Sequence, residues 1–107
     1  MLLDIIEVKA SLTLYSTKDG GRNTGIKSGY RPNHVFEYED NSNQYKTTYI
    51  GQIEFDKSLV LPSETHCVKV IFLKHRNIKD FIEVGRVWWI HEGDVKVGEA
   101  IITEIVI

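Results

Sequence analysis

A strict alternation of apolar and other residues near the start of the chain constrains the fold more than any other feature. Every second residue from Ile6 to Leu14 is apolar, and most of the residues between them are polar or charged. Because successive side chains of a strand point to opposite faces, this period predicts a strand with one buried face. No window of ten residues has an apolar stripe at helical spacing, so we expect no substantial helix.

Five later segments have the β-branched and aromatic content of strands, and turn-forming residues separate them. These segments are 34–39, 45–55, 66–73, 84–92 and 97–107. In the third of them, Val68, Val70 and Phe72 share one face, and Gly51 in the second is expected to form a bulge or a turn. About six short strands at this spacing predict an antiparallel barrel or sandwich, and a barrel would pair the first strand with the last.

Composition narrows the class of protein. The chain has 107 residues, 42% hydrophobic and 26% charged, which is typical of one globular domain spanning 1–107. A net charge of -2 argues against binding to nucleic acid by bulk charge. The single cysteine, Cys67, fits a reducing compartment, and no apolar run is long enough for a membrane helix. We therefore expect a cytoplasmic protein without a membrane contact.

The segment 19–32 reads DGGRNTGIKSGYRP and concentrates four glycines and two arginines in one connection. A phosphate-binding P-loop needs two glycines with four residues between them, then Lys and Ser or Thr. Gly20 and Gly25 have that spacing, but Ile26 stands where the lysine is required, and Lys27 comes one place late. The segment also joins two predicted strands rather than opening a helix, so we expect no nucleotide binding.

Several segments in order resemble the C-terminal β-barrel domain of elongation factor Tu: GGRNTG, SGYRPN, an aromatic strand, Gly51, Leu61-Pro62, IHEGD and VGEA. The resemblance covers about residues 6 to 107. It implies an all-β, six-stranded, antiparallel closed barrel of Greek-key type. It also implies that GTPase activity is not in this chain, because that family carries it in a separate domain.

The resemblance implies a structural role for the glycine-rich connection. We expect Gly20 and Gly21 to allow a backbone path that other residues resist. Arg22 and Arg31 are expected to pair with carboxylates or backbone carbonyls and so to fix the shape of the loop. Direct contact with a ligand is the other interpretation, and both interpretations place a shaped loop on a β-scaffold.

The resemblance further implies contacts to the backbone of aminoacyl-tRNA and to a GTPase domain. Among the corresponding positions, Asn23, Asn33 and Ile50 differ from the family, whereas Glu92 and Gly93 are retained. Because contacts to phosphate and ribose need donors and acceptors at set positions, the changes weaken the expectation of tRNA binding. We therefore expect a non-catalytic protein-interaction module, with tRNA binding as the alternative. The expected partner is a translational GTPase, its factor, or a second copy of the chain.

The sequence VWWIHE contains two adjacent tryptophans, Trp88 and Trp89, which are informative about the core and the surface. Neighbouring strand residues point to opposite faces, so Trp88 and Trp89 cannot both enter one core. The resemblance implies core positions for Trp88 and Ile90, so we expect both in the core, with Trp89 pointing outward beside Val87 and His91. Either the stem of a lysine or arginine covers Trp89, or a partner docks on it.

No pattern of catalytic or metal-binding residues stands out. His66 and Cys67 are adjacent on a predicted strand and point to opposite faces, and no second cysteine exists for a zinc pair. Cys67 is expected to be a small buried thiol, and the acidic residues Glu92, Asp94 and Glu99 a solvated surface. We expect no enzyme, no cofactor and no metal. The predicted interaction surface consists of Arg22, Asn23, Arg31, Asn33, Trp89, His91, Glu92 and Gly93.

Overall fold

The computed structural model describes residues 4–39, 44–45 and 47–107, and its regular elements are almost entirely strands. The strands are β1 (Ile5–Leu14), β2 (Asn33–Val35), β3 (Tyr49–Glu54), β4 (Thr65–Leu73), β5 (Val87–Glu92) and β6 (Val95–Ile105). Within the described residues the only helical segments are two 3-10 turns, η1 (Thr17–Asp19) and η2 (Ile78–Phe81). No described helix has the length and apolar character that crossing a membrane requires.

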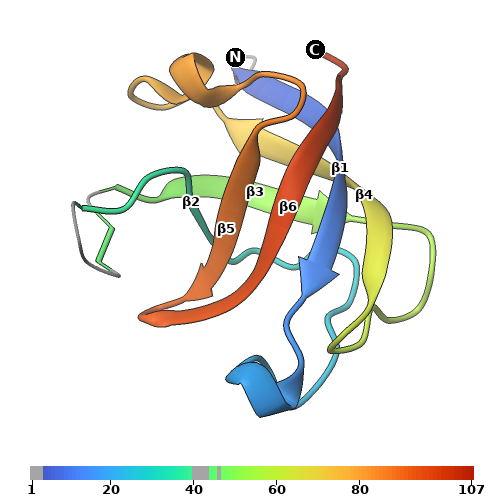
Figure 1. The fold of residues 1–107 in the computed structure, drawn as a ribbon. Coiled ribbons are helices and arrows are strands. Elements are labelled where there is room, and N and C mark those ends of the chain that lie inside the picture. The colour runs from blue at the N-terminus through green and yellow to red at the C-terminus, as the bar shows by residue number, and fades with distance from the viewer. Residues whose placement is uncertain (1–3, 40–43, 46) are drawn as a thin grey trace.

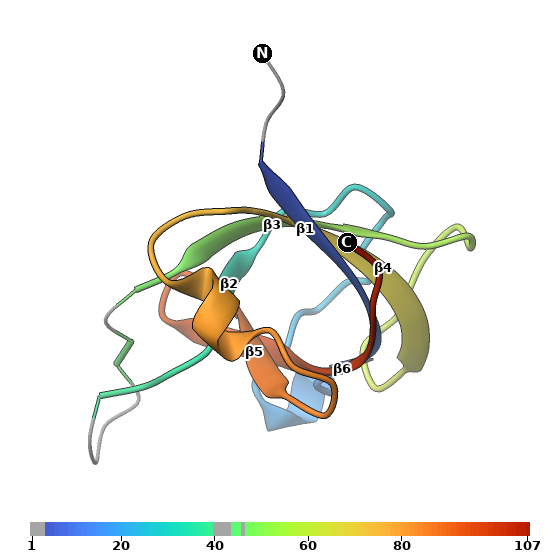
Figure 2. The ribbon, with the colours of Figure 1, turned by 90° about the horizontal axis from the view of Figure 1, so that it is seen from above.

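The six strands form one closed barrel in the order β1-β4-β3-β2-β5-β6 (Figure 1). All neighbouring strands are antiparallel, and β1 pairs with β4 on one side and with β6 on the other. Figure 2, a view from above, shows the strands surrounding a common interior. The prediction of a closed antiparallel barrel that pairs its terminal strands is confirmed.

The barrel interior is filled by alternate residues of each strand. The buried residues of β1 are those that the period of two predicted: Ile6, Val8, Ala10, Leu12 and Leu14. β4 contributes Val68, Val70 and Phe72, and β5 contributes Trp88 and Ile90, so these predictions are confirmed too. Full burial of one such aliphatic side chain stabilises a fold by about 1.5–3 kcal/mol.

Gly51 was predicted at a bulge or a turn, and that prediction is wrong. Gly51 lies inside β3, in regular register opposite Phe72. A Cβ atom at this position would lie 2.8 Å from Phe72 Cδ1 and 2.9 Å from His34 Nε2. The glycine therefore provides room for two ring side chains to pack against the backbone of β3.

The strand predicted over 34–39 ends early, because β2 stops at Val35. Phe36 still packs in the core, and the chain then leaves the barrel as an arm, defined here as residues 37–39 and 44–45 (Figure 1). An isolated bridge pairs Tyr38 with Tyr45, and Glu39 N–H donates to the Gln44 carbonyl at 2.7 Å. The turn-forming residues expected between the segments 34–39 and 45–55 are 40–44, and of these only Gln44 is among the described residues.

Candidate functional site

The glycine-rich segment connects β1 to β2, as expected, and its first glycines are required by the backbone path. Gly20 has a φ of 87°, in the left-handed region that favours glycine. Gly21 has no room for a side chain, since a Cβ there would lie 2.4 Å from the Tyr15 carbonyl oxygen. Both glycines therefore serve the role predicted for them, one through conformation and one through close packing.

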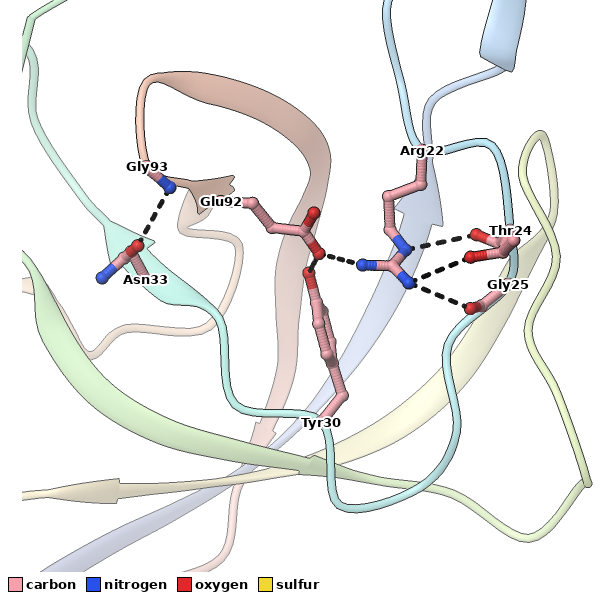
Figure 3. A network of polar contacts seen from close by, with 7 residues as sticks. All are labelled: Arg22, Thr24, Gly25, Tyr30, Asn33, Glu92 and Gly93. Carbon is pink, nitrogen blue, oxygen red and sulfur yellow. Dashed lines mark hydrogen bonds and ion pairs between the residues drawn. The ribbon is translucent and has the colours of Figure 1, made fainter.

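Arg22 joins this loop to the far end of β5 (Figure 3). Its Nη1 pairs with the Glu92 carboxylate, and the Tyr30 hydroxyl donates to the same carboxylate oxygen. Arg22 Nε donates to the Thr24 carbonyl at 3.2 Å, and Nη2 donates to the Gly25 carbonyl at 3.4 Å. The prediction that Arg22 fixes the loop through a carboxylate and backbone carbonyls is confirmed.

The Glu92 carboxylate raises the pKa of both of its partners, Arg22 and Tyr30. Burial raises the pKa of Tyr30, and the hydrogen bond and charge of Glu92 raise it further. Burial alone would lower the pKa of Arg22, but Glu92 raises it overall. The guanidinium also lies over the Tyr30 ring, 5.3 Å from its centroid. Arg22 is therefore a charged clamp within the chain, with its hydrogen-bonding directions turned toward the loop and Glu92.

Arg31 and Asn33 fix the neighbouring segment by other contacts. Arg31 Nε donates to the Gln52 side-chain oxygen at 2.9 Å, so the expected carboxylate or backbone carbonyl is replaced by an amide. Asn33 Oδ1 accepts a hydrogen bond from Gly93 N–H at 3.3 Å, which ties β2 to the turn between β5 and β6 (Figure 3). Asn23 is exposed and lines a shallow hollow of about 440 Å³ beside Glu92.

On β5 the two tryptophans separate as predicted. Trp88 is fully buried in the barrel, whereas Trp89 lies on the outer face and is partly exposed. The Tyr38 ring of the arm lies 5.1 Å from the Trp89 ring, and Lys96 Nζ lies 5.6 Å from the centre of Trp89. A lysine therefore covers part of Trp89, which was one of the two alternatives.

His91 was predicted on the outer surface beside Trp89, and that prediction is wrong, because its exposed fraction is only 1%. The register shifts between Ile90 and His91, and the arm covers the outer side of β5 at this point. Tyr38 donates its hydroxyl to His91 Nε2 at 2.6 Å, and His91 Nδ1 donates to the Gly93 carbonyl at 3.2 Å. Burial lowers the pKa of His91, which keeps this imidazole neutral.

Cys67 was expected to be buried, and this prediction is also wrong. Cys67 is exposed, because the inward register of β4 runs through Val68 and places its neighbour on the outer face. It lines a shallow groove of about 660 Å³ together with Lys9 and Lys69. His66, its neighbour in sequence, lines the same groove.

The acidic residues near the last turn are more than a solvated surface. Glu92 accepts hydrogen bonds from Arg22 and Tyr30, and Glu99 accepts one from the Tyr15 hydroxyl at 3.0 Å. In the part of the chain that the structure describes, no three His, Cys, Asp or Glu side chains gather where a metal ion could bind. The arrangement can hold a surface in a fixed shape.

Three residues that sequence reasoning did not single out are central to this region: Tyr30, Tyr38 and Lys96. Tyr30 was within the quoted GYRP motif, so its place in the loop was a usable signal. Tyr38 and Lys96 come together only because the arm folds over β5 and β6. A scan against models of protein families and a search of curated proteins found no match for this chain, so the functional argument rests on this geometry.

Proposed function

We propose that the chain is a non-catalytic binding module, similar to the C-terminal domain of elongation factor Tu, that docks a protein partner on the outer face of β5 and β6. One observation carries the proposal: this face presents a cluster of apolar side chains that the chain does not fully cover. We name it the β5–β6 patch, formed by Val87, Trp89 and Ile101.

The register explains why these side chains lie together. Ala100 and Ile102 point into the core, so Ile101 between them points outward, with 39% of its surface exposed. Val87 lies directly opposite Ile101 across the β5–β6 pair, and Trp89 is the diagonal neighbour. An apolar centre that contains a tryptophan, next to polar neighbours such as Glu99, has the composition of a protein interface.

The glycine-rich loop supports the same proposal through its rigidity. Glu92, at the end of β5, is clamped by Arg22 and Tyr30, and Gly93 is held by Asn33. A surface that is already ordered loses less conformational entropy when a partner binds. The resemblance favours a translational GTPase or its factor as the partner, in the cytoplasm, and a second copy of the chain is another outcome of the test.

The tRNA alternative has weaker support, because phosphate recognition needs cations that are available to the ligand. The Arg22 guanidinium is engaged with Glu92 and with loop carbonyls, and Arg31 donates to Gln52. Since electrostatic binding is strongest at low salt, a tRNA titration at low ionic strength tests this alternative directly. Absence of binding there removes it, and a steep loss of binding with added salt would favour it over a protein partner.

The β5–β6 patch is tested by changing one exposed residue on it and one elsewhere. Ile101→Glu adds a charge to the patch, whereas Ile50→Glu adds the same charge to β3, three strands away around the barrel from β6, at a residue that is 61% exposed. We expect a protein retained by the tagged wild-type chain to be lost with Ile101→Glu and kept with Ile50→Glu. The same pattern must recur with that protein in purified form.

Sedimentation distinguishes the kinds of partner. A wild-type dimer that Ile101→Glu converts to a monomer would identify a second copy as the partner. A partner retained equally by both variants would overturn the placement of the docking surface. A strictly monomeric wild-type chain that retains no protein would overturn the proposal as a whole.

A further inference from the structure

The ammonium group of Lys96 lies in a corner formed by two aromatic rings on the outer side of the barrel. Lys96 Nζ is 4.6 Å from the centre of the Tyr38 ring and 5.6 Å from the centre of the Trp89 ring. Both distances fall within the range of about 6 Å in which a cation is attracted to a ring face. The two rings are tilted by 60° with their centres 5.1 Å apart, so they form two walls around one cation.

The walls are fixed by the rest of the chain. Tyr38 is held by its hydrogen bond to His91 Nε2 at 2.6 Å, and His91 is held in turn by the Gly93 carbonyl. The backbone of Trp89 lies within the barrel, where it is paired with Val35 of β2 and Glu99 of β6. The aromatic corner is therefore already in the shape that a cation needs.

The Lys96 ammonium group is held more weakly than the Tyr38 and Trp89 rings that surround it. Over the residues that the structure describes, the Lys96 ammonium has neither an ion pair nor a hydrogen bond, so the two rings are its contacts. A lysine side chain is a flexible four-carbon stem that ends in a strongly hydrated ammonium group. Moving this group from the rings into water therefore costs little free energy. A second cation could thus replace it without breaking any polar contact.

We propose that this corner is a binding site for an alkylammonium group, and that Lys96 is an internal occupant which the ligand displaces. Quaternary ammonium groups, such as a trimethylated lysine side chain, suit such an aromatic site best, because they pack closely against ring faces. The carboxylate of Glu99, directly opposite Trp89 on β6, adds negative charge to the same outer face. If the ammonium group belongs to a lysine of a protein partner, the proposal rests on the proposed function. If it belongs to a small quaternary ammonium ion, the proposal is independent of that function.

The test uses the indole N–H signals in nitrogen–proton spectra during a titration with tetramethylammonium chloride. The Trp89 signal reports on the corner, and the Trp88 signal, from a fully buried ring, reports that the fold is intact. We expect Lys96→Ala to bind the ion about tenfold more tightly than the wild type, because a tethered competitor is removed. Tyr38→Leu removes one ring and keeps the Trp89 reporter, so its Trp89 signal should no longer shift with the ion. Trp89→Leu replaces it if the Trp88 signal changes, and the backbone amide signals around Lys96 are then the readout.

Two controls separate the site from general charge effects. Lys9→Ala removes an exposed lysine that pairs with Glu104 at 3.8 Å, and it should leave the affinity unchanged. Sodium chloride at the same ionic strength should leave the Trp89 signal in place. The proposal is overturned if Lys96→Ala shows no shift up to about 100 mM ion, far above the millimolar effective concentration of a tethered group. It is equally overturned if the aromatic variants bind as well as Lys96→Ala.

A pair of peptides identifies the source of the ammonium group. One carries a trimethylated lysine, and the other has the same sequence with an unmodified lysine. Tighter binding of a peptide than of the free ion assigns the ligand to a protein side chain, and binding of the free ion alone assigns it to a small molecule. Failure of this site leaves the Ile101→Glu experiment intact, because that residue does not contribute to the aromatic corner.

Discussion

Trp88 donates its indole N–H to Nδ1 of His34 at 3.0 Å, and both side chains are completely buried. An indole nitrogen can only donate, so Nδ1 of His34 must be the acceptor. The proton of the neutral imidazole is then on Nε2, which donates to the Gly51 carbonyl at 3.0 Å. The two partners use both ring nitrogens of His34, so a fully buried polar side chain is satisfied as a neutral group.

This contact predicts that the barrel loses stability in mild acid. Burial lowers the pKa of His34 to about 4, although the Gly51 carbonyl opposes the shift, whereas an unfolded histidine titrates near 6.5. Between these values the unfolded chain binds a proton that the folded chain excludes, so stability falls as the pH drops from 6.5 toward 4. Urea unfolding at several pH values should show a loss of about 3 kcal/mol from this group.

His34→Gln is the control, because it removes the titrating group and leaves His91 in place. His91 also has a lowered pKa, so its contribution has the same sign and is present in both proteins. The variant will be less stable at neutral pH, but its stability should change less between pH 6.5 and 4. An identical pH dependence in the two proteins would contradict a neutral His34 in the core.

Local pattern and resemblance together predicted much of the barrel. The period of two placed the inward face of β1 correctly from Ile6 to Leu14, because sheet geometry ties the side-chain direction to sequence parity. The same parity separated Trp88 from Trp89. The clamp formed by Arg22 was expected from the family motif. Parity and motif could not identify its carboxylate partner, Glu92, which is 70 residues from Arg22 and 62 residues from Tyr30 in the chain.

The wrong predictions for His91 and Gly51 share a physical cause, which is contact between segments distant in sequence. His91 is buried because the arm covers it and because a register shift interrupts the parity of β5. Gly51 was predicted at a bulge or a turn, but it is a glycine because the rings of Phe72 and His34 leave no room for a Cβ atom. Register shifts and close packing of this kind leave no periodic signal, so single-sequence reasoning has no basis on which to anticipate them.

Glu92→Ala is predicted to loosen the glycine-rich loop. The substitution removes the acceptor of both Arg22 and Tyr30, and since Arg22 and Glu92 side chains are 24% and 38% exposed, solvent screening reduces the effect. We expect a loss of about 1 kcal/mol in the free energy of unfolding. Amide hydrogen exchange should become faster across residues 21–25, where the Arg22 side chain now holds two carbonyls.

Glu104→Ala is the matched control for that change. Glu104 pairs with Lys9 at 3.8 Å, and both side chains are 59% exposed, so its removal should alter stability by less than about 0.5 kcal/mol. Equal effects of the two substitutions, or unchanged exchange in the loop with Glu92→Ala, would show that the clamp does not order the loop.

Gly51→Ala is predicted to disturb the core around His34. The added methyl group would lie 2.8 Å from Phe72 Cδ1 and 2.9 Å from His34 Nε2, so one of the rings must move. Such overpacking costs about 1–3 kcal/mol, measurable by urea unfolding, and the Trp88 indole signal should shift with its acceptor. Gly29→Asn is the control: Gly29 has a φ of 96° with open space around it, so this substitution strains the backbone without a steric contact. A Trp88 indole signal that shifts as much with Gly29→Asn as with Gly51→Ala would contradict the close packing described here.

Cys67 is predicted to react in the folded protein. Its side chain is exposed on the outer face of β4, and its neighbour across the β1–β4 pair is the small Ser11. A thiol-specific reagent should therefore label Cys67 fully without denaturant, at a rate comparable with that in the unfolded chain. Cys67→Ser should change the free energy of unfolding by less than about 0.5 kcal/mol, because an exposed side chain has little packing to lose. Labelling that begins only when urea unfolds the barrel would instead place the thiol in the core and would reverse the inward and outward faces assigned to β4.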